Sequence, residues 1–216
     1  YECLIRWSVD GEIRSPAVFL DRFREAIKDD APYAHVVEIR RRLSHRAARE
    51  GVGFLTYNIG LEDLHTLAGP EQLRNDFGAD ANQAFQIVIE VTERGLPQHL
   101  GDNLTDLKLS WSKLRDRQSA LALDDFGALE SNLYRLRELD IDYVKIDKGL
   151  IMSVSEDERS SAIVHAIAGL CNALGIQVIA EGIESDQQSK TVRNLGIPIQ
   201  QGFFLGRPHA ADHYLG

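Results

Sequence analysis

The stretch LALDDFG at residues 121–127 determines the expected fold. Its apolar start runs directly into two adjacent carboxylates, Asp124 and Asp125. This pattern predicts a buried strand over 121–124 that ends at the pair. Two ionised groups at a strand end are costly to bury unless a positive charge lies close, and a divalent metal ion is a common source of that charge. Aspartate is also common in turns and helix caps, so the pair alone is equally consistent with a capped loop.

Outward from this stretch, expected strands and helices alternate along one domain that covers residues 1–216. The other strands are expected at about 1–7, 52–58, 85–91, 142–146, 176–180 and 197–204. Helices are expected at about 15–28, 33–50, 131–139, 158–174 and 186–195. Such alternation is typical of a parallel α/β sheet. A closed (β/α)8 TIM barrel needs eight strands and seven are visible, so we expect the eighth upstream of Tyr1.

Polar side chains stand at the ends of these expected strands. Because the carboxyl ends of parallel strands meet at one face of a barrel, we expect the side chains to gather there, where barrel enzymes have their active sites. The series is rich in carboxylates and also contains one lysine and two amides: Asn58, Glu90, Asp124, Asp125, Lys145, Asp147, Glu181 and Gln201. One such residue would be consistent with a turn or a cap, but an unbroken series predicts an active site.

Composition restricts the classes of partner. The net charge of −9 and the isoelectric point near 5.3 argue against binding DNA or contacting an anionic membrane surface directly. The two cysteines, Cys3 and Cys171, form no CxxC motif, which is consistent with a reducing cytoplasm. No run of about 18 apolar residues occurs. We therefore expect a cytoplasmic protein, with any membrane anchor lying in a longer parent.

Taken together, the motifs resemble those of EAL domains, the cyclic di-guanylate (c-di-GMP) phosphodiesterases. The match covers nearly the whole chain, and seven motifs occur in the family's order: ECLIRW at 2–7, TYNIG at 56–60, EVTE at 90–93, DDFG at 124–127, VKID at 144–147, AEGIE at 180–184 and QGFFLGRP at 201–208. The resemblance implies a modified TIM (β/α)8 barrel of the EAL type that lacks its N-terminal strand in this sequence.

The resemblance also implies a role for each motif residue. The family's metal ligands correspond to Glu2, Asn58, Glu90 and Asp124, with Asp125 assisting at a second ion. These oxygen donors suit one or two Mg²⁺ or Mn²⁺ ions rather than a soft metal. The catalytic positions correspond to Glu181, the general base, and Lys145, which lies near the attacking water in the family.

Three further residues have implied roles outside the metal set. Arg6 and Gln201 correspond to positions that contact the cyclic dinucleotide, although Arg6 is also consistent with a simple ion pair on its own strand. Glu93 corresponds to the glutamate that stabilises the loop after DDFG. The expected reaction is the in-line hydrolysis of one phosphodiester of cyclic di-GMP to linear pGpG, in bacterial second-messenger signalling.

The sequence departs from the family in two places. The family's strand with a Q-P-I motif is absent before ECLIRW, and the loop that usually reads TGYSSL is ALESNL at 128–133. Leucine at 129 replaces a glycine, and glycine permits backbone conformations that leucine resists. In the family this loop couples metal binding to dimerisation.

These departures leave open a second class of function. A catalytically impaired EAL domain would serve as a c-di-GMP receptor or as a protein-interaction scaffold. A barrel aldolase or lyase with Lys145 as a Schiff base is a third and more remote reading. The resemblance further implies a homodimer and fusion to sensory or GGDEF domains in a longer protein.

Overall fold

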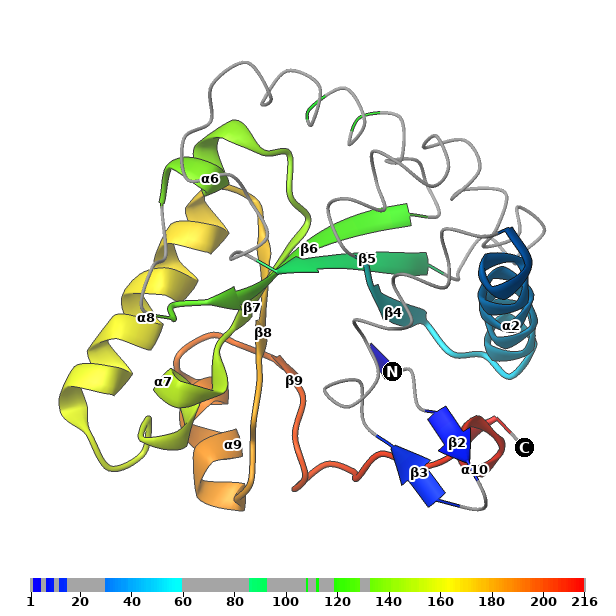
Figure 1. Cartoon of the computed structure of the whole chain (residues 1–216). Coiled ribbons are helices and arrows are strands. Elements are labelled where there is room, and N and C mark those ends of the chain that lie inside the picture. Colours follow the sequence, from blue (N-terminus) through cyan, green and yellow to red (C-terminus); the bar gives the residue numbers. More distant parts are fainter. Residues whose placement is uncertain are drawn as a thin grey trace.

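The structure is a computed structural model, and it describes residues 2–4, 7–9, 12–14, 30–59, 86–92, 108, 112, 119–128 and 133–215. Seven parallel strands form one curled sheet in the order β1-β4-β5-β6-β7-β8-β9 (Figure 1). They are β1 (Glu2–Cys3), β4 (Phe54–Asn58), β5 (Gln86–Thr92), β6 (Ser119–Phe126), β7 (Tyr143–Ile146), β8 (Gln177–Ala180) and β9 (Ile199–Gln200). A separate antiparallel pair consists of β2 (Trp7–Val9) and β3 (Glu12–Arg14). The seven-stranded parallel α/β prediction is thus confirmed.

The described helices are α2 (Asp30–Arg49), α6 (Tyr134–Glu138), α7 (Lys148–Met152), α8 (Glu158–Ala173), α9 (Asp186–Asn194) and α10 (Ala211–Tyr214). Helix α8 begins at an Asp157 cap that accepts the backbone N–H groups of Arg159 and Ser160, and α9 begins with a capping box between Ser185 and Gln188. None of the described helices is both long and apolar enough to cross a membrane. The helix expected at 15–28 lies outside the described residues.

The main core fills the space between the sheet and its helices (Figure 1). Helix α8 contributes the buried side chains of Val164, Ala168 and Cys171, which lie three or four residues apart on one face. They pack in the same cluster as Val144 and Val178 of the sheet. This burial explains why the apolar period of residues 158–174 predicted α8 correctly.

A second, smaller cluster lies on the other face of the strands. Its members are Val88, Ala120 and Ala122, against which Phe54 and Tyr143 pack. Side chains alternate between the two faces of a strand, so residues two positions further along these strands project on the same side as this cluster. Glu90, Asp124 and Lys145 occupy such positions, two residues after Val88, Ala122 and Tyr143.

The last strand lies within the expected region 197–204 and is short, as the Ile-Pro-Ile-Gln start predicts, because the backbone after Gln200 turns to bind a neighbouring loop. The carbonyl of Gln201 accepts the N–H of Ile183, and the carbonyl of Ile183 accepts the N–H of Phe204, both at 3.0 Å. The strand therefore ends at Gln200. These bonds attach the loop that carries Glu181 to the loop that carries Gln201.

The contact between these two loops requires glycine at position 202. A Cβ atom there would lie 2.1 Å from the Ile183 carbonyl oxygen and 2.3 Å from its nitrogen. We expect Gly202→Ala to lower the free energy of unfolding by about 2–4 kcal/mol, because backbone must move. Gly169→Ala is the control, since nothing lies within 4 Å of a Cβ at this helical position and alanine there should stabilise by about 0.5–1 kcal/mol. Urea denaturation measures both, and equal stability of the two variants would contradict the assignment.

Candidate active site

A buried ammonium group lies at the centre of the carboxyl ends of the strands. The Nζ atom of Lys145 on β7 is 2.6 Å from Glu181 Oε1, 2.9 Å from Glu90 Oε2 and 3.3 Å from Asp124 Oδ1. Glu2 Oε2 lies further away, at 4.0 Å. The Lys145 side chain is 1% exposed. Carboxylates from four strands or strand ends thus converge on one cation, as the series of polar strand ends predicted.

Two amides hold the carboxylate of Glu2 on the edge strand β1. Asn58 Nδ2 donates to Glu2 Oε1 at 2.7 Å, and Gln201 Nε2 donates to Glu2 Oε2 at 2.5 Å. Strands β1 and β9 are the two edges of the sheet. The bond from Gln201 therefore joins the two edges through side chains, and it brings together residues that are 199 positions apart in the sequence.

An irregularity in β6 explains how two consecutive aspartates lie at one site. Neighbouring residues of a regular strand point to opposite faces. The register between β6 and β7 shifts between Leu123 and Phe126, and Asp125 has a positive φ of 58°. Aspartate tolerates this left-handed conformation better than most residues do. The strand was predicted to end at Asp124, but it continues through this irregularity to Phe126.

The irregularity places three carboxylates within reach of one ion. One oxygen from each of Asp124, Asp125 and Glu181 lies within 4.8 Å of the others. Sequence reasoning assigned Glu181 to proton transfer alone. In the structure its carboxylate also lies at the candidate metal cluster, a role that its position in AEGIE does not reveal.

Burial shifts the pKa values of the central groups. Desolvation raises the pKa of Glu90 and of Glu181 to about 7, and the nearby ammonium of Lys145 only partly opposes this shift. Burial alone would lower the pKa of Lys145, but Glu90, Asp124, Glu181 and Glu2 together raise it above its ordinary value. Lys145 therefore remains charged at neutral pH. Its single positive charge does not neutralise all the carboxylates around it.

The donor set fits a divalent cation. In the described part of the chain, five carboxylates lie at the site, from Glu2, Glu90, Asp124, Asp125 and Glu181, and four of them pair with Lys145. Among the described residues, neither oxygen of the fully buried Glu90 side chain has a hydrogen-bond partner, although Oε2 forms the ion pair with Lys145. Buried carboxylate oxygens without hydrogen-bond donors suit a hard cation such as Mg²⁺ or Mn²⁺.

The raised pKa values predict that the metal-free protein loses stability as pH rises. Between pH 4.5 and about 7, Glu90 and Glu181 keep protons in the folded state that the unfolded chain has released. The folded state then binds more protons, so the free energy of unfolding falls with pH. We expect a loss of about 2–4 kcal/mol between pH 5 and pH 8, measured by urea denaturation in EDTA.

Glu90→Gln is the control for this pH dependence, because an amide of the same shape cannot ionise. Its free energy of unfolding should fall less between pH 5 and pH 8 than that of the parent. A parent whose stability stays constant or rises over this range would show that these carboxyls are ionised throughout.

Two predicted site residues, Arg6 and Glu93, lie outside the described residues, as do positions 129–132 of the ALESNL loop. Asp147 does not join the described cluster. It caps α7 instead, where its Oδ1 accepts the N–H of Gly149 at 2.9 Å. The other predicted residues lie together: Glu2, Asn58, Glu90, Asp124, Asp125, Lys145, Glu181 and Gln201.

Comparison with known proteins identifies the family. The family model of the EAL domain matches residues 1–208. The chain belongs to the EAL domain family. Its relatives include the cyclic di-GMP phosphodiesterase RocR of Pseudomonas aeruginosa, which is 36% identical over 129 residues, 60% of this chain and 32% of RocR. A second relative, named "Probable cyclic di-GMP phosphodiesterase PdeN" in Escherichia coli K12, is 30% identical over 99% of this chain and 41% of PdeN. The chain thus spans less than half the length of either relative.

Solved EAL structures have the same fold. An EAL domain protein from Listeria monocytogenes gives a TM-score of 0.82 at 24% identity, over 99% of this chain and 83% of that one. BlrP1 of Klebsiella pneumoniae, in a complex with manganese and cyclic di-GMP, gives a TM-score of 0.72 at 28% identity, over 96% of this chain and 51% of BlrP1. The curled parallel sheet is therefore the TIM-like fold of EAL domains.

Proposed function

We propose that this chain is a phosphodiesterase that uses Mg²⁺ or Mn²⁺ to hydrolyse cyclic di-GMP to linear pGpG. The observation that carries the proposal is the convergence of four carboxylates on the buried ammonium of Lys145, with the Asp125 carboxylate grouped beside those of Asp124 and Glu181. The names of the relatives support cyclic di-GMP as the substrate, since RocR, which is 36% identical to this chain, is named a cyclic di-GMP phosphodiesterase. The manganese and dinucleotide complex of BlrP1 supports the cofactor.

The oxygen donors have two groupings. Glu2, Asn58, Glu90 and Asp124 would hold one ion, and Asp124 with Asp125 and Glu181 would hold a second. A bound divalent ion supplies Lewis acidity, which lowers the pKa of water and stabilises charge on phosphate oxygens. Asn58 and Gln201 restrain the Glu2 carboxylate, so this ligand is oriented before an ion arrives.

Glu181 and Lys145 have complementary roles in the reaction. The Glu181 carboxylate accepts a proton from the attacking water. The water oxygen forms a bond to phosphorus as the P–O3′ bond breaks. The Lys145 ammonium, 2.6 Å from Glu181, stabilises the negative charge that develops on the phosphate. Gln201, at the same rim, contacts the dinucleotide.

A c-di-GMP receptor without turnover is the second candidate function. The divergent ALESNL loop at 128–133 favours it, because the loop begins directly after DDFG. The complete set of carboxylates favours the enzyme. A receptor has no need for a carboxylate base 2.6 Å from a buried lysine.

Product analysis tests the choice between enzyme and receptor. The protein is incubated with cyclic di-GMP and either Mn²⁺ or EDTA, and pGpG is quantified by chromatography. The enzyme should form pGpG with Mn²⁺ and none with EDTA. Saturable binding of cyclic di-GMP without pGpG would identify a receptor, and neither binding nor product would leave a scaffold.

The wider setting of the domain is also a proposal. We infer a cytoplasmic homodimer that is fused to sensory or GGDEF domains. The relatives support the fusion, since MucR of P. aeruginosa is named as both a diguanylate cyclase and a phosphodiesterase, and this chain covers 21% of it. Neither cysteine forms a disulfide, which is consistent with a reducing compartment.

A further inference from the structure

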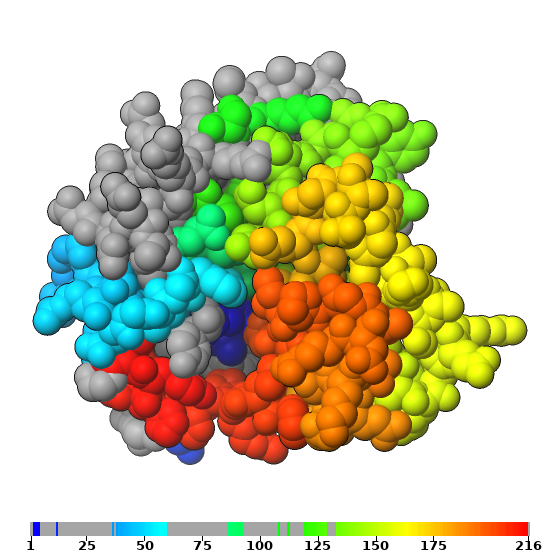
Figure 2. All heavy atoms as spheres, turned by 180° about the vertical axis from the view of Figure 1, so that it is seen from behind, coloured from blue at the N-terminus to red at the C-terminus, as the bar shows by residue number. Residues whose placement is uncertain are grey.

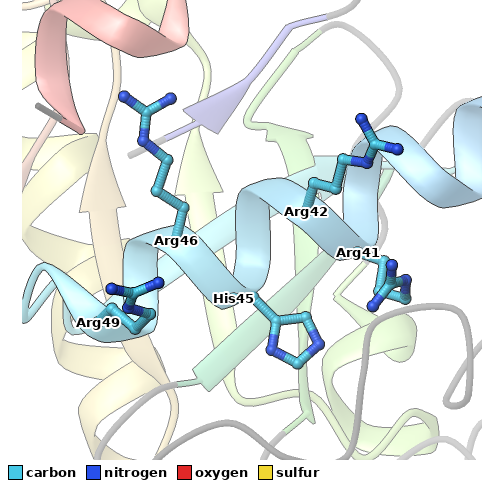
Figure 3. A pocket seen from close by; sticks show the side chains of 5 residues that line it. All are labelled: Arg41, Arg42, His45, Arg46 and Arg49. Atoms are coloured by element: carbon cyan, nitrogen blue, oxygen red, sulfur yellow. The ribbon is translucent and has the colours of Figure 1, made fainter.

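Helix α2 carries a cluster of basic side chains that the active site does not use. Arg41, Arg42, His45, Arg46 and Arg49 line a shallow hollow of about 310 Å³ (Figure 3). Figure 3 shows Arg42 and Arg46 pointing to one edge of the helix, Arg41 and His45 to the other, and Arg49 lying over the end of the helix. Residues 42, 45, 46 and 49 have the spacing of one helix face. The chain as a whole has a net charge of −9, so this cluster is a local reversal of sign.

The opposite face of α2 keeps the cluster in place. Ser44 and Ala47 are buried, and the Ser44 hydroxyl lies 3.1 Å from the Tyr57 hydroxyl on β4. The helix therefore cannot rotate to hide its basic face without losing these contacts. The arginines have a fixed position at the surface, which is what a preformed binding site requires.

Nearby acids leave part of the positive charge available. Glu38 pairs with Arg41 and Arg42, at 2.9 Å and 2.5 Å. Arg46 pairs with Asp212 of the C-terminal segment, which lies beside α2 in Figure 2. Among the described residues no carboxylate lines the hollow itself. One glutamate for two arginines leaves an excess of charge, and the Arg42 side chain remains 75% exposed.

The kind of ligand follows from the chemistry of the lining. Guanidinium groups bind phosphate through two parallel hydrogen bonds, and planar guanidinium and imidazole groups stack on nucleobases. The volume lies at the small end of ligand sites. The overall charge of −9 repels a long polyanion but tolerates a small one. A phosphate-bearing ligand with a planar base fits all these features.

We propose that the basic hollow on α2 is a binding site for a free nucleotide with a polyphosphate group. Arg42 and Arg49 bind the phosphates, and His45 contacts the base. The site is separate from the carboxylate cluster, and it gives the domain a way to respond to a second small molecule. Its occupation does not depend on the proposed hydrolysis.

Calorimetric titration of the whole chain with GTP in EDTA tests the site. EDTA removes divalent ions, and the carboxylate cluster then repels anions, so that binding reports on the hollow. We expect saturable binding of GTP whose affinity falls as the salt concentration rises. The double variant Arg42→Gln with Arg49→Gln should bind GTP at least tenfold more weakly than the parent. Arg193→Gln, an exposed arginine on α9, is the matched control and should bind GTP as the parent does. Tripolyphosphate should displace GTP, whereas guanosine should not.

Three outcomes would overturn the proposal. They are the absence of saturable binding at millimolar GTP, equal affinity of the parent and the Arg42 and Arg49 double variant, and competition by guanosine as strong as that by tripolyphosphate. Single-stranded RNA that binds more than tenfold more tightly than GTP would assign the surface to nucleic acid instead. Circular dichroism of the double variant shows that any loss of binding is not a loss of folding.

Discussion

Glu181→Gln is expected to reduce the hydrolysis of cyclic di-GMP about a thousandfold. Glutamine keeps the shape of the side chain but cannot accept the proton of the attacking water, and general-base catalysis contributes roughly 10²–10⁴-fold. The change also leaves Lys145 without its nearest carboxylate, which lies at 2.6 Å. The measurement is kcat with saturating Mn²⁺, followed by the release of pGpG.

The variant must be separated from one that has only lost metal. Glu181 lies within 4.8 Å of the oxygens of Asp124 and Asp125, so its Mn²⁺ affinity is measured alongside kcat. We expect the affinity to fall much less than kcat. Glu156→Gln, at an exposed position, is the control and should behave as the parent does. A Glu181→Gln protein with parental kcat would show that the proton goes elsewhere.

Lys145→Met should destabilise the metal-free protein by about 3 kcal/mol at pH 8. Methionine fills a similar volume but leaves the surrounding carboxylates without their cation, and loss of one partner of a buried ion pair typically costs about 3–5 kcal/mol. Mn²⁺ should restore much of this loss, because it neutralises the same oxygens. Turnover should nevertheless remain low with Mn²⁺, since no ammonium lies beside the reacting phosphate.

Lys190→Met is the matched control for Lys145→Met. Lys190 also pairs with a carboxylate at 2.6 Å, that of Asp186, but the two side chains are 73% and 60% exposed. An exposed ion pair of this kind contributes less than about 0.5 kcal/mol to the free energy of unfolding. If both lysine variants lost equal stability, the carboxylates around Lys145 would have to be protonated or hydrated rather than paired with it.

The sequence predicted the parts of this site that depend on strand ends. Apolar strands that end at Asn58, or one or two residues after Lys145 and Glu90, place these residues at the carboxyl edge of a parallel sheet. Long helices such as α8 were predictable for a similar reason, since a continuous apolar face shows its period clearly.

Other features of the site and the fold could not be predicted from any short stretch of the sequence. The positive φ of Asp125 depends on the register between β6 and β7, which alternation along a single strand does not contain. The bond between Gln201 and Glu2 joins the two ends of the chain. Helices α7 and α10, of five and four residues, are too short for a helical period to be detected.

Single-turnover hydrolysis tests the central claim most directly, namely that the carboxylates around Lys145 form a metal-dependent hydrolytic centre. Excess protein is mixed with labelled cyclic di-GMP and Mn²⁺, and the reaction is quenched over time, beside Glu181→Gln and an EDTA control. We expect conversion to linear pGpG by the parent alone and only with metal. Binding of the dinucleotide by parent and variant with no cleavage by either would contradict it and assign the domain to c-di-GMP sensing.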